Sequence, residues 1–138
     1  MKLETNIIIN APVADVWQIF SDFETYPQWN PFVKALNGVV EEGEQIAIQL
    51  PGMNFKPKVL KYTINKEMRW KGKLGIPGIF DGEHYFILEE MSPAETRFIH
   101  GEKFSGILVP FMKKKIKTDV REGFESMNVA LKNRVEER

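Results

Sequence analysis

The stretch PFMKKKIKTDVREGFESMNVALKNRVEE, residues 110–137, carries the clearest structural signal in the sequence. Its apolar residues recur at steps of three or four: Met112, Ile116, Val120, Phe124, Met127, Leu131 and Val135. That spacing places them on one stripe of an α-helix, and Pro110 suits the first turn. Such a helix is roughly 40 Å long, enough to cross a whole sheet. The stripe therefore needs an apolar partner surface elsewhere in the chain.

The residues before this helix predict an antiparallel sheet as that partner. Residues 3–10 form a first strand, in which β-branched residues cluster. Turn residues then separate six later stretches with strand character, at residues 32–40, 45–50, 55–65, 68–74, 80–90 and 96–104. Short successive strands with tight connections favour an antiparallel meander.

A short amphipathic segment lies between the first strand and the rest of the sheet. Pro12 suits a helix start, and Val16, Trp17 and Phe20 follow on one helical face. Two later prolines end this helix and favour a turn or a second short helix. The sequence thus predicts a single α+β domain over residues 1–138. Its curved antiparallel sheet of six to seven strands wraps around the long C-terminal helix, with one or two short helices after the first strand.

Composition excludes several classes of function. The chain has no cysteine, which excludes disulfides, thiolate metal sites and a cysteine nucleophile. Lys plus Arg equals Asp plus Glu at 19 each, so no overall charge draws the protein to nucleic acid. No apolar run is long enough to span a membrane, and no glycine-rich phosphate loop is present. We expect a soluble, cytoplasmic protein without stable membrane insertion, cofactor or metal, as a monomer or homodimer.

The segment APVADVWQIFSDFETYPQWNP, residues 11–31, resembles the N-terminal signature of the START-like, birch-pollen-allergen superfamily, also called SRPBCC. More narrowly, it is similar to the polyketide cyclase/dehydrase and lipid-transport group. The stretches FDGEHYF at residues 80–86 and EKFSG at residues 102–106 extend the resemblance over nearly the whole chain. The resemblance implies a helix-grip fold with a deep cavity between the sheet and the C-terminal helix. It implies no single reaction, because the superfamily includes lipid carriers, hormone receptors, cyclases, hydrolases and chaperone activators.

Strand alternation predicts the side chains that face this cavity. We expect the ligand to contact aromatic residues and three ionisable ones: Trp70, Phe80, His84, Phe86, Phe98, His100, Glu102 and Phe104. Six glycines interrupt the later strands and turns, at positions 72, 75, 78, 82, 101 and 106. They either curve the sheet or, together with that curvature, leave room for the ligand.

His84, His100 and Glu102 are the candidates for chemistry. Two imidazoles and a carboxyl group in an apolar cavity can act as general acid and base, or they can hold the polar end of a ligand. No metal site is predicted, because zinc usually takes three or four ligands and only these three side chains are available.

The preferred interpretation is a module that binds or transports a small hydrophobic ligand, either lipid-like or aromatic and polyketide-like. Whether it is an enzyme stays open, and the balance leans against it. The alternatives are an acid–base enzyme of the cyclase or dehydratase type, and a protein-interaction module of the chaperone-activator type.

Three apolar loops, at residues 51–55, 75–79 and 106–111, are expected to form the cavity mouth if they cluster. Lys113, Lys114, Lys115 and Lys117 follow the last of them directly. These lysines either support transient contact with an anionic membrane or form a solvated helix face.

Overall fold

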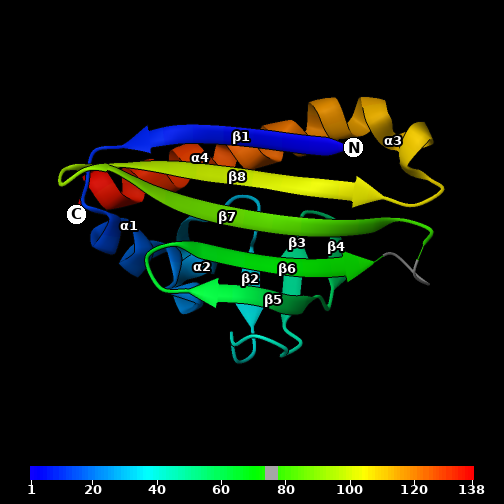
Figure 1. The fold of residues 1–138 in the computed structure, drawn as a ribbon, viewed down its shortest axis with the longest axis horizontal. Helices are drawn as coiled ribbons and strands as arrows, with labels where there is room; N and C mark the ends of the chain where they lie inside the picture. The colour runs from blue at the N-terminus through cyan, green and yellow to red at the C-terminus, as the bar shows by residue number, and fades with distance from the viewer. Residues whose placement is uncertain (74–77) are drawn as a thin grey trace.

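The computed structural model describes residues 1–73 and 78–138 and shows the helix-grip architecture that the resemblance implies (Figure 1). A curved antiparallel sheet of five strands forms one layer. Across the sheet its strands are β1 (Lys2–Ile9), β8 (Glu95–Ser105), β7 (Asp81–Ser92), β6 (Glu67–Lys73) and β5 (Lys58–Thr63). Alternate residues of each strand face inward, as Leu3, Thr5 and Ile9 do in β1.

The predicted C-terminal helix is confirmed, and it runs behind the sheet in Figure 1. It consists of α3 (Val109–Lys115), a π-helical turn (Ile116–Val120) and α4 (Arg121–Glu136) without a break in the chain. The apolar stripe faces the sheet: Ile116, Phe124, Met127, Leu131 and Val135 are all buried. In the described part of the chain, no helix is both long enough and apolar enough to cross a bilayer.

The short helices after the first strand are also confirmed. They are α1 (Val13–Phe20), a 3₁₀ turn (Phe23–Thr25) and α2 (Tyr26–Trp29). After α2, the side-chain oxygen of Asn30 accepts hydrogen bonds from the backbone N–H groups of Phe32 and Val33, at 3.0 and 2.9 Å. This turn sends the chain inward and buries Phe32 beneath α4.

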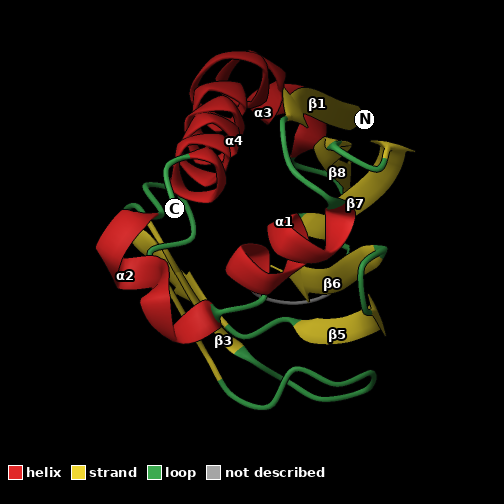
Figure 2. Cartoon of the chain, turned by 90° about the vertical axis from the view of Figure 1, so that its left-hand side faces the viewer, coloured by secondary structure: helices red, strands yellow, loops and turns green. Residues whose placement is uncertain are grey.

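The strands do not all join one meander, because three short ones form a separate sheet. These are β2 (Ala35–Asn37), β3 (Ala47–Leu50) and β4 (Met53–Phe55). A tight turn at Gly52, where φ is +75°, returns β4 along β3. Pro57 lacks a backbone N–H group, and beyond it β5 joins the larger sheet. Figure 2 shows the small sheet, α2 and α4 on one side of the five-stranded sheet.

Candidate functional site

The inner face of the larger sheet brings the predicted chemical residues together. Trp70 of β6, His84 of β7 and Glu102 of β8 lie side by side in one row of the strand register. Phe86 and His100 occupy the neighbouring row. Both histidines are buried, with exposed fractions of 3 % or less.

Five polar side chains form a continuous hydrogen-bonded chain across this otherwise apolar interior. Glu102 Oε1 lies 2.8 Å from His84 Nδ1, and His84 Nε2 lies 2.7 Å from His100 Nε2. His100 Nδ1 lies 3.0 Å from Asn128 Oδ1 on α4. Asn128 Nδ2 donates to Thr5 Oγ1 at 2.9 Å, and the Thr5 hydroxyl donates to the backbone carbonyl of His100 at 3.0 Å.

The last bond of this polar chain sets the direction of all the others. A carbonyl oxygen only accepts, so the Thr5 hydroxyl gives it the proton and accepts in turn from the Asn128 amide. Asn128 Oδ1 then accepts from His100 Nδ1–H, and neutral His100 accepts at Nε2 from His84 Nε2–H. Neutral His84 is therefore an acceptor at Nδ1. It follows that Glu102 is a protonated acid that donates to His84.

Burial favours the same protonation states. Desolvation lowers the pKa of His84 to about 3. It also holds the pKa of His100 well below its usual value, and the neighbouring His84 adds to that shift. Desolvation raises the pKa of Glu102 to about 8. The short contact between His84 and Glu102 is thus a neutral hydrogen bond at neutral pH, although its geometry would also suit an ion pair.

Aromatic rings enclose the two imidazoles. The His84 ring stacks on Trp70 with centroids 4.9 Å apart, and the His100 ring stacks on Phe124 at 4.1 Å. Phe32 lies 6.1 Å from His84 and 5.3 Å from Phe124, so it fills the space between the sheet and α4. Gly123 on α4 makes this possible, because a Cβ there would lie 2.6 Å from the Phe32 ring.

Glu102 is the accessible end of the polar chain. Its side chain is 17 % exposed, against 4 % for His84. The free carboxyl oxygen, Oε2, lies over Gly82, where any Cβ would collide with it. Half-buried Phe80 packs against Phe104 nearby, with centroids 5.7 Å apart. A ligand that reaches the polar chain would therefore meet Glu102 first.

The other predicted contact residues lie deeper. Phe86 and Phe98 are fully buried with His100, and both rings pack against Phe20 of α1 at 5.0 and 5.7 Å. The predicted ligand set therefore divides into a deep group and a group near Glu102 that contains Phe80 and Phe104. Which of these side chains contact a ligand stays a prediction.

The interrupting glycines make room for neighbouring side chains. Gly72 lies beneath the Phe55 ring, Gly82 beneath the Glu102 carboxyl group and Gly101 beneath Tyr85 on the outer face. Gly75 lies outside the described residues, as does most of the predicted loop at residues 75–79.

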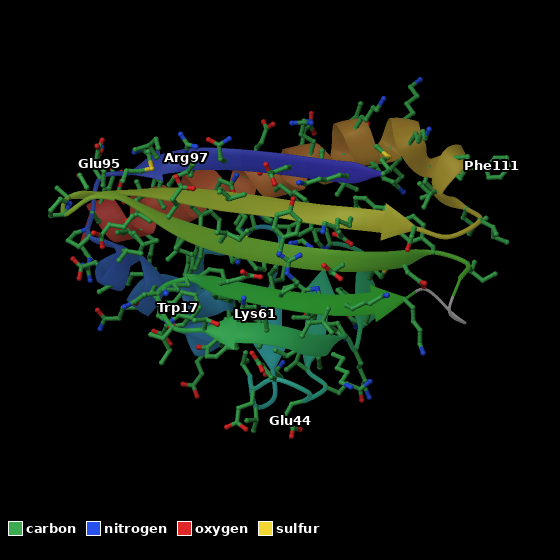
Figure 3. The ribbon with its side chains drawn as sticks, viewed as in Figure 1. Trp17, Glu44, Lys61, Glu95, Arg97 and Phe111 are labelled. Carbon is green, nitrogen blue, oxygen red and sulfur yellow. The ribbon has the colours of Figure 1, made fainter. Side chains whose placement is uncertain are left out.

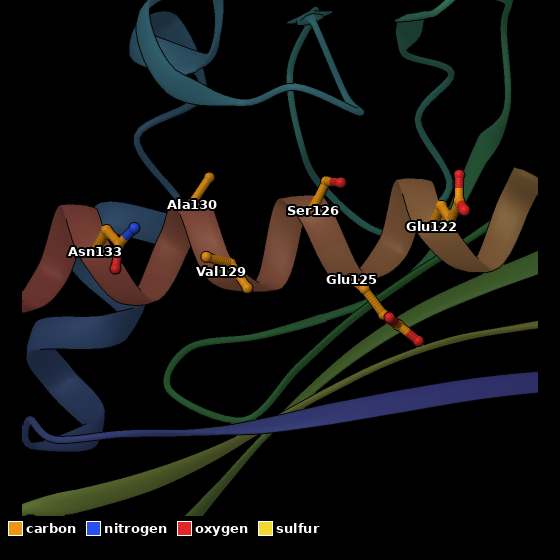
Figure 4. A pocket seen from close by; sticks show the side chains of 6 residues that line it. All are labelled: Glu122, Glu125, Ser126, Val129, Ala130 and Asn133. Atoms are coloured by element: carbon orange, nitrogen blue, oxygen red, sulfur yellow. The ribbon is translucent and has the colours of Figure 1, made fainter.

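Two hollows stand out among the described residues, and both are open to the surface. The side chains lining one come entirely from α4 (Figure 4), and the other lies against β3 and β4. Neither lies between the larger sheet and α4, so the internal ligand cavity stays a prediction. Within residues 1–73 and 78–138, no three His, Asp or Glu side chains are grouped to hold a metal ion.

Sequence reasoning missed Thr5, Phe32, Phe124 and Asn128 as parts of the site. Asn128 left a usable signal, because it is a polar residue beside Met127 on the inner stripe of the long helix. The position of Phe32 left none, since it depends on the turn at Asn30 and on Gly123.

Comparison with known proteins gives a family match over most of the sequence. The family model described as polyketide cyclase / dehydrase and lipid transport matches residues 1–136. The comparison with curated proteins gave no match.

Several solved structures share the fold. A START superfamily protein from Mycobacterium smegmatis is 24 % identical, with a TM-score of 0.72 over 99 % of this chain and 97 % of that chain. A hypothetical protein from Helicobacter pylori is 14 % identical, with a TM-score of 0.82 over 98 % of this chain and 88 % of that chain. The di-domain ARO/CYC protein BexL of the BE-7585A biosynthetic pathway is 14 % identical, with a TM-score of 0.73 over 95 % of this chain. The chain spans about half of BexL, 46 % of its length. At these identities the likeness shows the fold alone.

Proposed function

Since the chain belongs to the polyketide cyclase/dehydrase and lipid-transport family, we propose that it binds a small hydrophobic molecule between the five-stranded sheet and α4. The family membership confirms the resemblance seen at residues 11–31. The observation that carries the proposal is the polar chain that ends at a neutral, partly accessible Glu102 within an aromatic interior. A polar group at such a position typically orients a ligand that apolar surface holds.

The protonation state of Glu102 determines which kind of polar group on the ligand it can bind. Its single O–H is donated to His84, which leaves Oε2 as an uncharged acceptor above Gly82. An uncharged acceptor in apolar surroundings favours a neutral donor such as a hydroxyl or a phenol. An anionic head group would be desolvated there, and no Lys or Arg of the described chain is buried to pair with it. We therefore expect a lipid-like or aromatic ligand that carries a hydroxyl group.

A pair of matched probes tests this binding mode. We expect the protein to bind 2-naphthol about tenfold more tightly than naphthalene, as one added hydrogen bond predicts. Trp70 lies beside His84, so quenching of tryptophan fluorescence can report binding. Glu102→Gln keeps a donor for His84 and an acceptor oxygen, so it should retain the preference. Glu102→Leu should abolish it.

The control is Glu95→Leu, which changes an exposed carboxylate on the same strand. Equal affinity for both probes in the wild-type protein, or an unchanged preference in Glu102→Leu, would contradict the proposal. Native mass spectrometry of freshly purified protein gives an independent check, because a retained ligand adds its mass.

An acid–base enzyme is the second candidate, and the hydrogen bonds that connect Glu102 through His84 to His100 favour it. A carboxyl group whose pKa is about 8 can exchange a proton near neutral pH. Hydrogen exchange next to the carbonyl of 2-tetralone, followed by NMR in D₂O, separates the two functions. If the wild-type protein catalyses this exchange, and Glu102→Gln loses the catalysis but still binds 2-naphthol, the result supports the enzyme. If the wild-type protein does not catalyse the exchange, the result supports the binding module.

A further inference from the structure

The connection between β8 and α3 exposes a group of apolar side chains that the proposed ligand site does not use. We name Ile107, Leu108 and Phe111 the apolar tip. Their exposed fractions are 67 %, 37 % and 83 %. Val109 between them is buried and anchors the connection to the core. Figure 3 shows Phe111 at one extreme end of the molecule, directed away from it.

Backbone hydrogen bonds hold the apolar tip in place. The N–H groups of Ile107 and Leu108 donate to the carbonyls of Gly78 and Ile79, each at 3.0 Å. The N–H of Phe111 donates to Leu108 O at 3.0 Å. The three side chains are thus presented on an ordered backbone, which lowers the entropy lost when a partner covers them.

Lysines border the apolar tip. Lys113, Lys114, Lys115 and Lys117 follow it in the helix, and the first three are exposed residues of α3. On the outer face of the sheet, one register row near the same end contains four more lysines and one glutamate: Lys58, Lys71, Glu83, Lys103 and Lys2.

Two acidic residues near this end have hydrogen-bond partners. Glu83 accepts a hydrogen bond from Arg69 at 2.8 Å, and Asp81 accepts from the backbone N–H of Gly78 at 3.1 Å. Asp119, Glu122 and Glu125 follow the lysines along the helix. Glu89, Glu90 and Glu95 lie around the β7–β8 turn, and Figure 3 shows Glu95 at the end opposite Phe111.

We propose that the apolar tip and the lysines beside it dock onto the surface of an anionic phospholipid bilayer. A projecting, non-spanning apolar group can enter the boundary between head groups and acyl chains, while the lysines meet the lipid phosphates. A protein partner would need a concave surface shaped to the tip, whereas a bilayer deforms to accept it. This inference does not depend on the ligand bound inside.

Vesicle sedimentation tests the proposal on the full chain. We expect binding to vesicles of phosphatidylcholine with about one third phosphatidylglycerol, no binding to phosphatidylcholine alone, and release by added salt. Lys114→Gln should weaken binding roughly fivefold, by the usual contribution of one lysine. Ile107→Ser should also weaken binding several-fold, because less apolar surface enters the bilayer.

The β5–β6 turn supplies matched controls at the other end of the molecule. Ile64 is 67 % exposed, the same fraction as Ile107, and Lys66 is an exposed lysine. Ile64→Ser and Lys66→Gln should bind vesicles as the wild-type protein does. Any of three results would overturn the proposal. The wild-type protein does not bind anionic vesicles, it binds neutral vesicles equally well, or the two control variants lose as much vesicle binding as Ile107→Ser and Lys114→Gln. The proposal would also be overturned if the wild-type protein forms a dimer that Ile107→Ser dissociates and does not bind vesicles. That result would assign the apolar tip to contact with a second copy of the chain.

Discussion

Glu102 shows how a single residue can be ionisable and yet uncharged at neutral pH. Among the described residues no Lys or Arg is buried, and the hydrogen-bond partner of the carboxyl group is a histidine that burial keeps neutral. Desolvation keeps both histidines neutral, and the hydrogen-bond direction along the polar chain then makes Glu102 the donor, in agreement with the raised pKa of its carboxyl group. Alternation along two strands predicts that Glu102 faces inward. Its protonation could not be predicted, because that depends on Thr5 and Asn128 from distant parts of the sequence.

Replacing this carboxyl group should change how stability depends on pH. The carboxyl titrates near 4.5 in the unfolded chain and near 8 in the folded protein. The stability it contributes is therefore complete below pH 4.5 and is lost as the pH rises through 8. Glu102→Gln does not titrate, so its stability relative to wild type should increase by up to about 5 kcal/mol between these limits. Urea unfolding at several pH values measures the difference, and a pH-independent difference would contradict the assigned protonation.

The two histidines supply an internal control for that experiment. Their pKa values lie below the ordinary value of 6.5, so both proteins should lose stability as the pH falls from 6.5 toward 3. Below pH 4.5, where the Glu102 carboxyl is protonated in both the folded and the unfolded chain, this acid limb should be the same in Glu102→Gln and in wild type. A change in the acid limb would mean that the glutamine has disturbed the His84–His100 contact.

At the scale of elements, α4 contributes to the polar chain as well as to apolar packing. Asn128 bonds both His100 and Thr5, so it connects the helix to β8 and β1. Asn128→Leu keeps the approximate size but leaves both buried partners unpaired. We expect a loss of about 2–4 kcal/mol in the free energy of unfolding.

A second substitution checks this reason for the loss. Thr5→Val removes one of the unpaired groups, so the double variant should lose less than the sum of the two single losses. Asn133→Leu, at an exposed position of the same helix, should change stability by less than about 0.5 kcal/mol. Additive losses in urea unfolding would show that Asn128 and Thr5 are not coupled.

The elements themselves were more predictable than the way they assemble. The 3.6-residue period identifies α4, and period-two alternation places His84 and His100 on the same inner face. The division into two sheets escapes prediction because the sequence places Met53 and Asn54 in a loop and Phe55 at the start of one strand over residues 55–65, whereas Met53–Phe55 pairs with β3 and a separate strand, β5, follows. Neither the Asn30 turn nor the contact of Phe32 with Gly123 has a periodic signal.

At the scale of the whole molecule, the two sheets differ in how firmly they are paired. β7 spans twelve residues and pairs with β6 and β8 on its two sides, whereas each strand of the small sheet has three or four residues. Hydrogen bonds connect the small sheet to β5 where residues 43–46 meet residues 57–59. Short, separately paired strands open more often than long central ones.

This difference predicts how a ligand enters an interior that Phe32 and its neighbours fill. Hydrogen exchange followed by mass spectrometry should show amides of β2 and β3 exchanging well before those of β7 and β8. Bound 2-naphthol should slow exchange in β2 and β3 and leave β7 unchanged, because movement of the small sheet would carry Phe32 away from His84 and admit the ligand. Thr96→Ala, which removes a buried hydroxyl bonded to the Ala11 carbonyl, should leave the effect of 2-naphthol unchanged. If the backbone amides of both sheets are equally protected from exchange in the free protein, this entry route is wrong. A ligand would then have to enter beside Glu102 without any opening between the sheets.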